Sequence, residues 1–195
     1  MCEHYCGSAP NDYHEFSVEL VSNIIFKLKR GEAAGLDRLT AEHLVHCHPS
    51  LSCILSKLLN LMLCYGYIPR DFGQSYTVPL FKANDCRTES ALCSDFRGIA
   101  LSFILSKVLE HCILDRFNEF FSTNDNQFGF KKSTSCSHAI YSVRNIANRF
   151  IGGGSTANLY TINLSKAFDK VNHALFFKLM KRRIPIKLLD LLVYW

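Results

Sequence analysis

The stretch LYTINLSKAFD, residues 159–169, decides the fold, because it joins an apolar run to a turn and the start of a helix. Isoleucine, tyrosine and threonine favour strands, so residues 157–164 are predicted to form a buried strand. Asn163 would then lie at the carboxyl edge of a sheet, where ligands commonly bind. The helix that follows is predicted to turn four apolar side chains inward, namely Phe168, Val171, Leu175 and Leu179.

Two short strands and several helices complete the predicted fold. Residues 76–81 and 96–101 have the composition of strands, and Pro79, which cannot donate a ladder hydrogen bond, favours an edge position. Apolar residues at helical spacing predict further helices. These include helices ending near Arg30, Gly66, Phe117 and Gly152, a short helix capped by Thr40, and a last one beginning at Ile186. The predicted fold class is α+β, mostly helical, with a small antiparallel sheet.

The composition limits the class of protein. A chain of 195 residues with 48% hydrophobic content can bury a real core. No apolar run reaches the roughly 18 residues that span a bilayer, so no membrane segment is expected, and no secretory signal is expected at the start. The nine cysteines have no Cys-x-x-Cys spacing, which predicts reduced thiols inside a cell. This pattern does not distinguish the nucleus from the cytoplasm. The net charge of +5 favours anionic partners.

Cations flank the two short strands. Lys82 and Arg97 lie at the two ends of the polar connection between them. If the strands pair, both cations could reach one bound anion, and Arg97 would offer a bidentate fork. The alternative is that both are solvated loop charges, just as Phe168 alone could be ordinary core packing. A second basic run fits either an exposed helix face or a phosphate-binding surface, and consists of Lys178, Lys181, Arg182, Arg183 and Lys187.

One cluster invites a metal interpretation. His43 and Cys47 share a helical face in the run that also contains His46 and His48. No second ligand pair has a recognisable zinc spacing, so a structural zinc site is the weaker alternative.

Five segments follow one another in a recognisable order. They are KLKRGEAAGLD at 27–37, VPLFK at 78–82, DFRGIALS at 95–102 with LSKVLE at 105–110, QFGFKK at 127–132, and LSKAFDKVNH at 164–173. From about residue 20 onward, this order and spacing resembles the reverse transcriptase of non-LTR (LINE-type) retrotransposons.

The resemblance implies a right-hand polymerase that copies RNA into DNA with two Mg²⁺ ions. Its partners would be an RNA template, a DNA primer and deoxynucleotides. It implies a lead-in at 1–19, a fingers-like region at 20–156, and the start of a palm, cut short, at 157–195.

The resemblance also assigns roles to residues around the nucleotide. Lys82 and Arg97 match the fingers cations that hold the incoming triphosphate. Phe168 matches the aromatic gate that stacks under the sugar and rejects a ribose 2′-hydroxyl. Asn163 stands where the family has its first metal-binding aspartate.

A second set of residues matches the surroundings of the template. Gln127, Gly129 and Phe130 match a segment near the template and nucleotide pocket. Gly98 replaces the proline that usually follows the fingers arginine, which predicts a looser strand.

The departures concern the metal ligands. Asn163 offers a neutral amide oxygen in place of a carboxylate, a loss on the order of several kcal/mol for hard-cation binding and transition-state stabilisation. The family's pair of adjacent aspartates has no counterpart in the 195 residues. No metal site is therefore predicted to be intact, and the chain alone is predicted to be inactive. The alternatives are a non-catalytic nucleic-acid-binding module and a decayed remnant of a mobile element.

Overall fold

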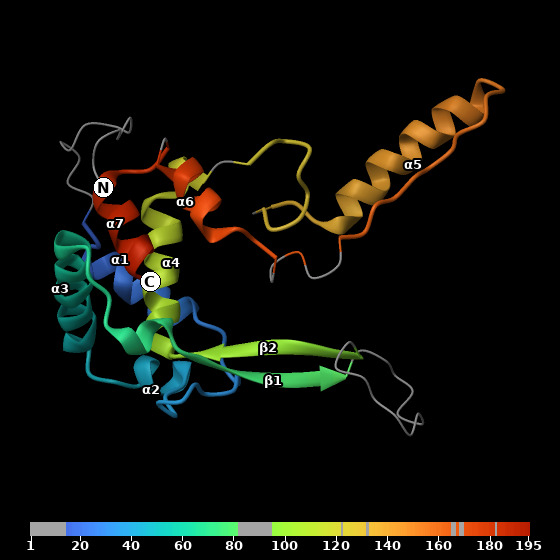
Figure 1. The fold of residues 1–195 in the computed structure, drawn as a ribbon. Coiled ribbons are helices and arrows are strands. Elements are labelled where there is room, and N and C mark those ends of the chain that lie inside the picture. Colours follow the sequence, from blue (N-terminus) through green and yellow to red (C-terminus); the bar gives the residue numbers. More distant parts are fainter. Residues whose placement is uncertain are drawn as a thin grey trace. The chain divides into compact units, whose positions relative to one another are not determined.

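The computed structural model describes residues 15–81, 95–121, 123–131, 133–164, 167, 170–181 and 183–195 (Figure 1). The regular elements in this part of the chain are helices and one two-stranded antiparallel sheet, which agrees with the predicted α+β class. In chain order the elements are α1 (Val18–Lys27), α2 (Ala41–Val45), α3 (Ser50–Tyr65), η1 (Arg70–Gly73), β1 (Ser75–Phe81), β2 (Phe96–Ser102), α4 (Ile104–Arg116), η3 (Asn118–Phe121), α5 (Cys136–Gly152), α6 (His173–Met180) and α7 (Ile186–Tyr194).

The chain divides into two compact units. The first contains the chain up to Phe120 together with Ala174–Trp195, and the second contains Phe121–His173. These boundaries differ from the division at residue 157 that the resemblance implies, and the assignment of fingers and palm remains a prediction.

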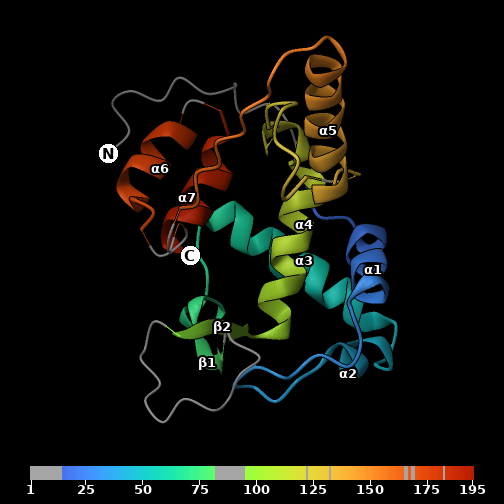
Figure 2. The same cartoon turned by 90° about the vertical axis from the view of Figure 1, so that its right-hand side faces the viewer.

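The core of the first unit forms where α1 packs against α3 and α4, and where α7 packs against α3 (Figure 2). Phe16 and Phe117 are fully covered there, and their rings meet edge to face with centroids 6.3 Å apart. Burial of one such side chain contributes about 1.5–3 kcal/mol. The other large side chains with almost no exposure are Val21, Leu59, Val108, Leu109, Cys112, Ile184, Leu188 and Leu191.

Two side chains of α3 hold the backbone just before α1. The N–H of Phe16 donates to Asn60 Oδ1 at 2.7 Å, and its carbonyl accepts from Ser56 Oγ at 2.6 Å and from Asn60 Nδ2 at 3.0 Å. A buried peptide without such partners would be costly. Ser17 then caps α1 by accepting from the N–H of Leu20 at 3.1 Å. The entry into α1 is therefore fixed by tertiary hydrogen bonds as well as by a local cap.

Several predicted helix ends are confirmed. Thr40 is the N-cap of α2, and Gly66 ends α3 with a φ of +59°, a left-handed conformation that glycine adopts readily. In the cap of α2, the N–H of Thr40 donates to His43 Nδ1 at 3.1 Å. His48 Nδ1 lies 2.7 Å from Ser50 Oγ. Two histidines of the cluster that was weighed as a zinc site, His43 and His48, thus have a ring nitrogen in a local hydrogen bond.

The second unit departs from the sequence prediction. α5 forms as expected, but none of its residues is buried. The predicted strand at 157–164 is wrong, because this segment has no regular secondary structure and its side chains are exposed, Ile162 by 91%. A strand needs a neighbour for its backbone groups, and the described sheet consists of β1 and β2 alone.

The predicted helix after the turn is also shorter than expected. α6 begins at His173, so Val171 precedes it and is exposed, and Leu175 within the helix is exposed by 54%. Phe168 and the side chain of Leu179 lie outside the described residues. In the last helix, α7, the buried residues are Leu188, Leu189 and Leu191.

Two composition-based expectations have structural counterparts. Cys47, Cys53, Cys64, Cys112 and Cys136 carry free thiols. Burial raises the pKa of the Cys112 thiol to about 12, with a smaller contribution from the charge of Asp115. Of the helices described, none combines the length and the apolar character needed to cross a bilayer.

Candidate functional site

The hairpin of β1 and β2 carries the first candidate residue, Arg97. The two strands pair antiparallel with Ser75 opposite Ser102 and Phe81 opposite Phe96, which confirms the predicted pairing. The rings of Phe81 and Phe96 close the far end of the ladder edge to face, with centroids 5.2 Å apart. In Figure 1 the hairpin projects away from the helices of its unit. The end of β2 that carries Arg97 therefore extends beyond the helical core.

Arg97 lies opposite Leu80 and is exposed. Within the described part of the chain, its guanidinium forms no ion pair or hydrogen bond. An exposed guanidinium of this kind can bind an anion such as a phosphate by donating two parallel hydrogen bonds to it. Lys82 follows Phe81 directly in the sequence and lies outside the described residues. The structure thus shows that Arg97 is accessible, and the anion-binding role of Arg97 and Lys82 stays a prediction.

Gly98 lets the two strands approach closely. A Cβ at this position would lie 2.8 Å from the Thr77 methyl group on the opposite strand. Its pairing partner is Pro79, which has no N–H to donate. β2 nevertheless runs without a break through Gly98, so this glycine fits the hairpin as it stands.

The segment before α2 anchors the base of the hairpin, and it contains the first of the five resemblance segments. A Cβ on Gly35 would lie 2.7 Å from the carbonyl oxygen of Ser102, so only glycine fits against the end of β2. The hydroxyl of Tyr76 donates to the carbonyl of Ala34 at 3.2 Å. Lys107 Nζ lies 3.1 Å from Glu32 Oε2 and links the same segment to α4. The glycine in this segment therefore has a packing role.

Carboxylates in this segment are held in the ionised form. The hydrogen bond and charge of Lys107 lower the pKa of Glu32, with a smaller contribution from Lys29. The backbone N–H of Gly31, which donates to Glu42 Oε1 at 2.6 Å, lowers the pKa of Glu42 to about 2, and the Thr40 hydroxyl adds to this effect. Both acids are engaged in contacts that hold the segment in place, Glu42 with Gly31 and Glu32 with Lys107 of α4.

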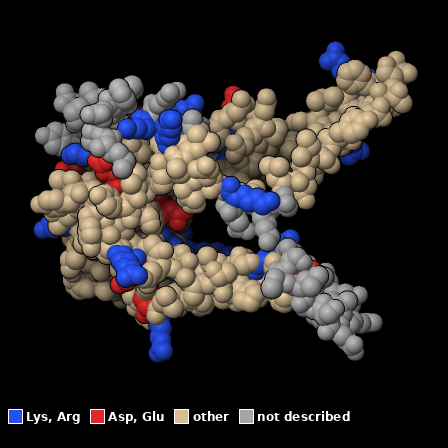
Figure 3. All heavy atoms as spheres, viewed as in Figure 1, with Lys and Arg blue, Asp and Glu red and all other residues tan. Residues whose placement is uncertain are grey.

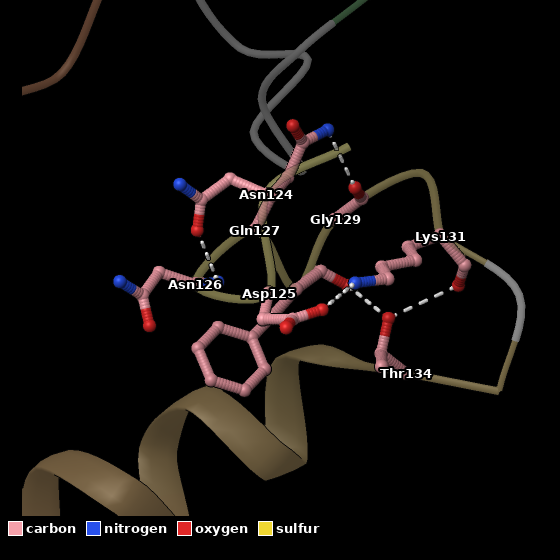
Figure 4. A network of polar contacts seen from close by, with 8 residues as sticks. Asn124, Asp125, Asn126, Gln127, Gly129, Lys131 and Thr134 are labelled. Atoms are coloured by element: carbon pink, nitrogen blue, oxygen red, sulfur yellow. Dashed lines mark hydrogen bonds and ion pairs between the residues drawn. The ribbon is translucent and has the colours of Figure 1, made fainter. Parts of the chain in front are cut away.

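The second candidate group lies in a loop of the other unit, residues 124–134, here called the 124–134 loop (Figure 4). Gln127 Nε2 donates to the carbonyl of Gly129 at 3.1 Å, so the structure brings two of the predicted residues together. The Gln127 amide is directed into its own loop. Phe130 is 92% exposed and has a φ of +55°.

Residues that the sequence analysis did not single out hold this loop. Lys131 Nζ lies 3.1 Å from Asp125 Oδ1, and Asn124 Oδ1 accepts from the N–H of Asn126 at 2.9 Å. Thr134 Oγ1 lies 3.0 Å from the Phe128 carbonyl and 3.1 Å from the Lys131 carbonyl, so its one proton is shared between them. The run Asn124-Asp125-Asn126 was the available signal, because Asn and Asp commonly stabilise turns through their side chains.

Asn163 lies in the same unit as the 124–134 loop, whereas Arg97 belongs to the other unit. Asn163 is exposed and is not at the end of a strand. Phe168, the predicted sugar gate, is outside the described residues. Among the described residues, there is no group of three or more His, Cys, Asp or Glu side chains that could hold a metal ion. Mg²⁺ in proteins is bound mainly by carboxylates, and the lack of an intact metal site at Asn163 stays a prediction.

Charge by itself does not mark a site. On the face seen in Figure 3, lysine and arginine side chains lie at several separate places among the described residues. The candidate residues are therefore distinguished by geometry, namely the hairpin position of Arg97 and the loop that carries Phe130.

Comparison with known proteins gives a distant relationship. No protein-family model matches the chain. Over 176 residues, or 88% of its length, the chain is 24% identical to the RNA-directed DNA polymerase from mobile element jockey of Drosophila melanogaster. The chain spans 19% of the length of that relative. This distant similarity supports a reverse-transcriptase-like relationship.

Proposed function

We propose that the 195 residues of this chain form the fingers-like part and the first palm segment of a non-LTR reverse-transcriptase-like protein. In this proposal they bind nucleic acid and do not catalyse polymerisation by themselves. The observation that carries it is the similarity to an RNA-directed DNA polymerase along 88% of the chain. The order of the five sequence segments and the exposed hairpin arginine also support it.

The binding part of the proposal depends on accessible cations. The chain has a net charge of +5, and Arg97 presents its guanidinium on a hairpin that projects from the helical core. Arg97 and Lys82 would contact phosphate groups of a nucleotide or a nucleic-acid strand. Phosphate contacts release counterions, so the affinity would fall steeply as salt rises.

The catalytic part of the proposal depends on missing negative charge. Phosphoryl transfer needs divalent cations held by carboxylates. Asn163 is neutral, and no two aspartates are adjacent in the sequence. We infer that the chain by itself cannot hold the two metal ions that copying requires.

Binding is tested with a fluorescent primer–template duplex and anisotropy measured over a series of salt concentrations. The expected result is binding that weakens steeply with salt, and Arg97→Gln should weaken it further at low salt. Arg70→Gln is the matched control. Arg70 is also exposed, but it lies in η1, which precedes β1 at the end opposite to Phe81. An affinity that does not change with salt, or equal effects of the two substitutions, would contradict the proposed contact.

Catalysis is tested by primer extension with Mg²⁺ and deoxynucleotides. We expect no extension by the chain, and none by Asn163→Asp, because one restored carboxylate does not make a two-metal site. Extension by either protein would refute the proposed inactivity.

A further inference from the structure

Helix α3 has apolar side chains on two opposite sides. The side that packs against α1 and α7 carries the buried residues Leu55, Leu59, Met62 and Leu63. The other side, here called the outer α3 face, carries Ile54, Leu58, Leu61 and Tyr65, which are 61%, 38%, 54% and 78% exposed. A surface helix normally turns polar side chains to the solvent, and an exposed apolar patch is typical of a contact surface.

The outer α3 face is held in a fixed position. The buried side of α3 belongs to the core of the first unit, and Ser56 and Asn60 on this helix bond to the backbone of Phe16. In Figure 1, α3 lies at the outer edge of its unit. Binding to this face therefore requires little ordering of the helix that carries it.

The spacing of the four side chains fits a second helix of the same kind. They follow one another at intervals of four, three and four residues, which is the spacing of the contact positions in a pair of coiled helices. Two copies of α3 can pair antiparallel about a two-fold axis between Leu58 and Leu61. Leu58 of each copy then faces Leu61 of the other, and Ile54 faces Tyr65 of the other.

The charge of α3 also suits contact between identical chains. The net charge of +5 makes two copies repel each other unless the contact avoids the cations. In the 16 residues of α3 the only charged residue is Lys57, which flanks the outer α3 face. In the antiparallel pair the two copies of Lys57 would be offset by about 8 Å along the helix axis, so no like charges face each other directly.

Other occupants suit this face less well. A phosphate backbone is bound by several cations, and the outer α3 face has Lys57 alone. Helices that bind membrane surfaces are rich in lysine and arginine beside their apolar face. We propose that the outer α3 face is a contact between two copies of this chain, paired antiparallel along α3. The stripe is short, so the expected dissociation constant is about 1–100 μM, as for a small interface.

Sedimentation velocity of the full chain without nucleic acid tests this association separately from the proposed function. The average mass should rise toward that of two chains over about 1–500 μM, a range that spans the expected dissociation constant. Leu61→Glu should raise the dissociation constant about 100-fold, because each dimer would bury two carboxylates against leucine. Ile146→Glu is the matched control, because Ile146 is 59% exposed on α5. It adds the same charge and should leave the association unchanged.

A second pair of substitutions tests the antiparallel arrangement. Leu58→Lys alone should also prevent association. In the double variant Leu58→Lys/Leu61→Glu, the new lysine of each copy would face the new glutamate of the other, so association should return and weaken as salt rises. In a parallel pair like charges would face each other, and the double variant would stay monomeric. Recovery in the double variant also excludes unfolding as the cause of the losses.

Support for the proposal requires loss of association in both single variants, recovery in the double variant and no change in Ile146→Glu. A parent chain that stays monomeric to about 500 μM, well above the expected dissociation constant, overturns it, and the outer α3 face then contacts a different molecule. Association that survives Leu61→Glu, or that is lost in Ile146→Glu instead, places the contact elsewhere and also overturns it. A double variant that remains monomeric rules out the antiparallel pair.

Discussion

Helices α4 and α5 both carry apolar side chains at helical spacing, and they have opposite surroundings. In α4, Val108, Leu109, Cys112 and Ile113 are buried, largely because α4 packs against α1. In α5, the corresponding stripe of Ile140, Val143, Ile146 and Phe150 is exposed, and no residue of the helix is buried.

The comparison shows that an apolar stripe marks a helix face that can be buried. It does not identify which element buries that face. The apolar face of α4 is buried against other helices of the same unit, so its burial contributes to the stability of that unit. The helical form of α5 depends on its own hydrogen bonds and its N-terminal cap. Four predictions test this contrast, from the largest expected effect to the smallest.

The largest effect is expected in the core of the first unit. Leu109→Ala removes a side chain with no exposure and should lower the free energy of unfolding by about 2–5 kcal/mol. Urea unfolding followed through the fluorescence of the single tryptophan, Trp195, measures this. Ile146→Ala on α5 is the control and should change stability by less than about 0.5 kcal/mol, as measured by circular dichroism. Equal losses would show that α5 is covered in solution.

A smaller loss is expected where α3 holds the backbone of Phe16. Asn60→Ala leaves the buried N–H of Phe16 without its acceptor, which should cost about 1–3 kcal/mol in urea unfolding. Asn145→Ala on α5 is the matched control, because Asn145 is exposed, and it should be nearly neutral. A neutral Asn60→Ala would mean that water replaces the amide and that the entry into α1 is not fixed by α3.

Two similar caps sharpen the contrast further. Thr40 and Ser135 are the N-caps of α2 and α5, and the backbone N–H of each donates to Nδ1 of a histidine three residues later. Ser135→Ala should destabilise the first turn of α5 by about 0.5–2 kcal/mol and speed amide exchange there. Thr40→Ala should have less effect on exchange, because Ala41 and Leu44 of α2 are buried. Faster amide exchange in α2 than in α5 would contradict the idea that burial of Ala41 and Leu44 protects α2.

The smallest effect is a pH dependence in the first unit. The Gly31 N–H lowers the pKa of Glu42 from 4.5 to about 2. A carboxyl whose pKa is lowered by folding stabilises the protein above its unfolded pKa, and that contribution is lost as pH falls from 4.5 toward 2. Unfolding measured over this range should be less pH-dependent in Glu42→Gln than in the parent chain. Identical slopes would show that the Gly31 contact is absent in solution.

Much of the first unit could be predicted from the sequence. The caps at Thr40 and Gly66, the pairing of the two short strands and the presence of α1 and α4 depend on local spacing and on residue chemistry. Local signals of this kind act within one or two turns, so they survive in the tertiary structure.

The prediction was wrong at residues 157–164, and the reason is physical. An apolar, β-branched run favours a strand, but a strand forms only when a neighbour satisfies its backbone groups. No described strand pairs with this segment, so its side chains are exposed and Asn163 does not lie at a sheet edge. The same limit applies to the inward face predicted for Leu175.

By itself, the sequence determined the α+β class, the main helices, the hairpin and the neutral residue at position 163, because these depend on residue types and short spacings. Only the tertiary structure decided that Gly35 must be a glycine against Ser102, that Asn60 holds Phe16, and that Phe130 is presented by a bonded loop. These features depend on groups brought together by packing or by side-chain hydrogen bonds, and the sequence pattern does not specify where those groups meet.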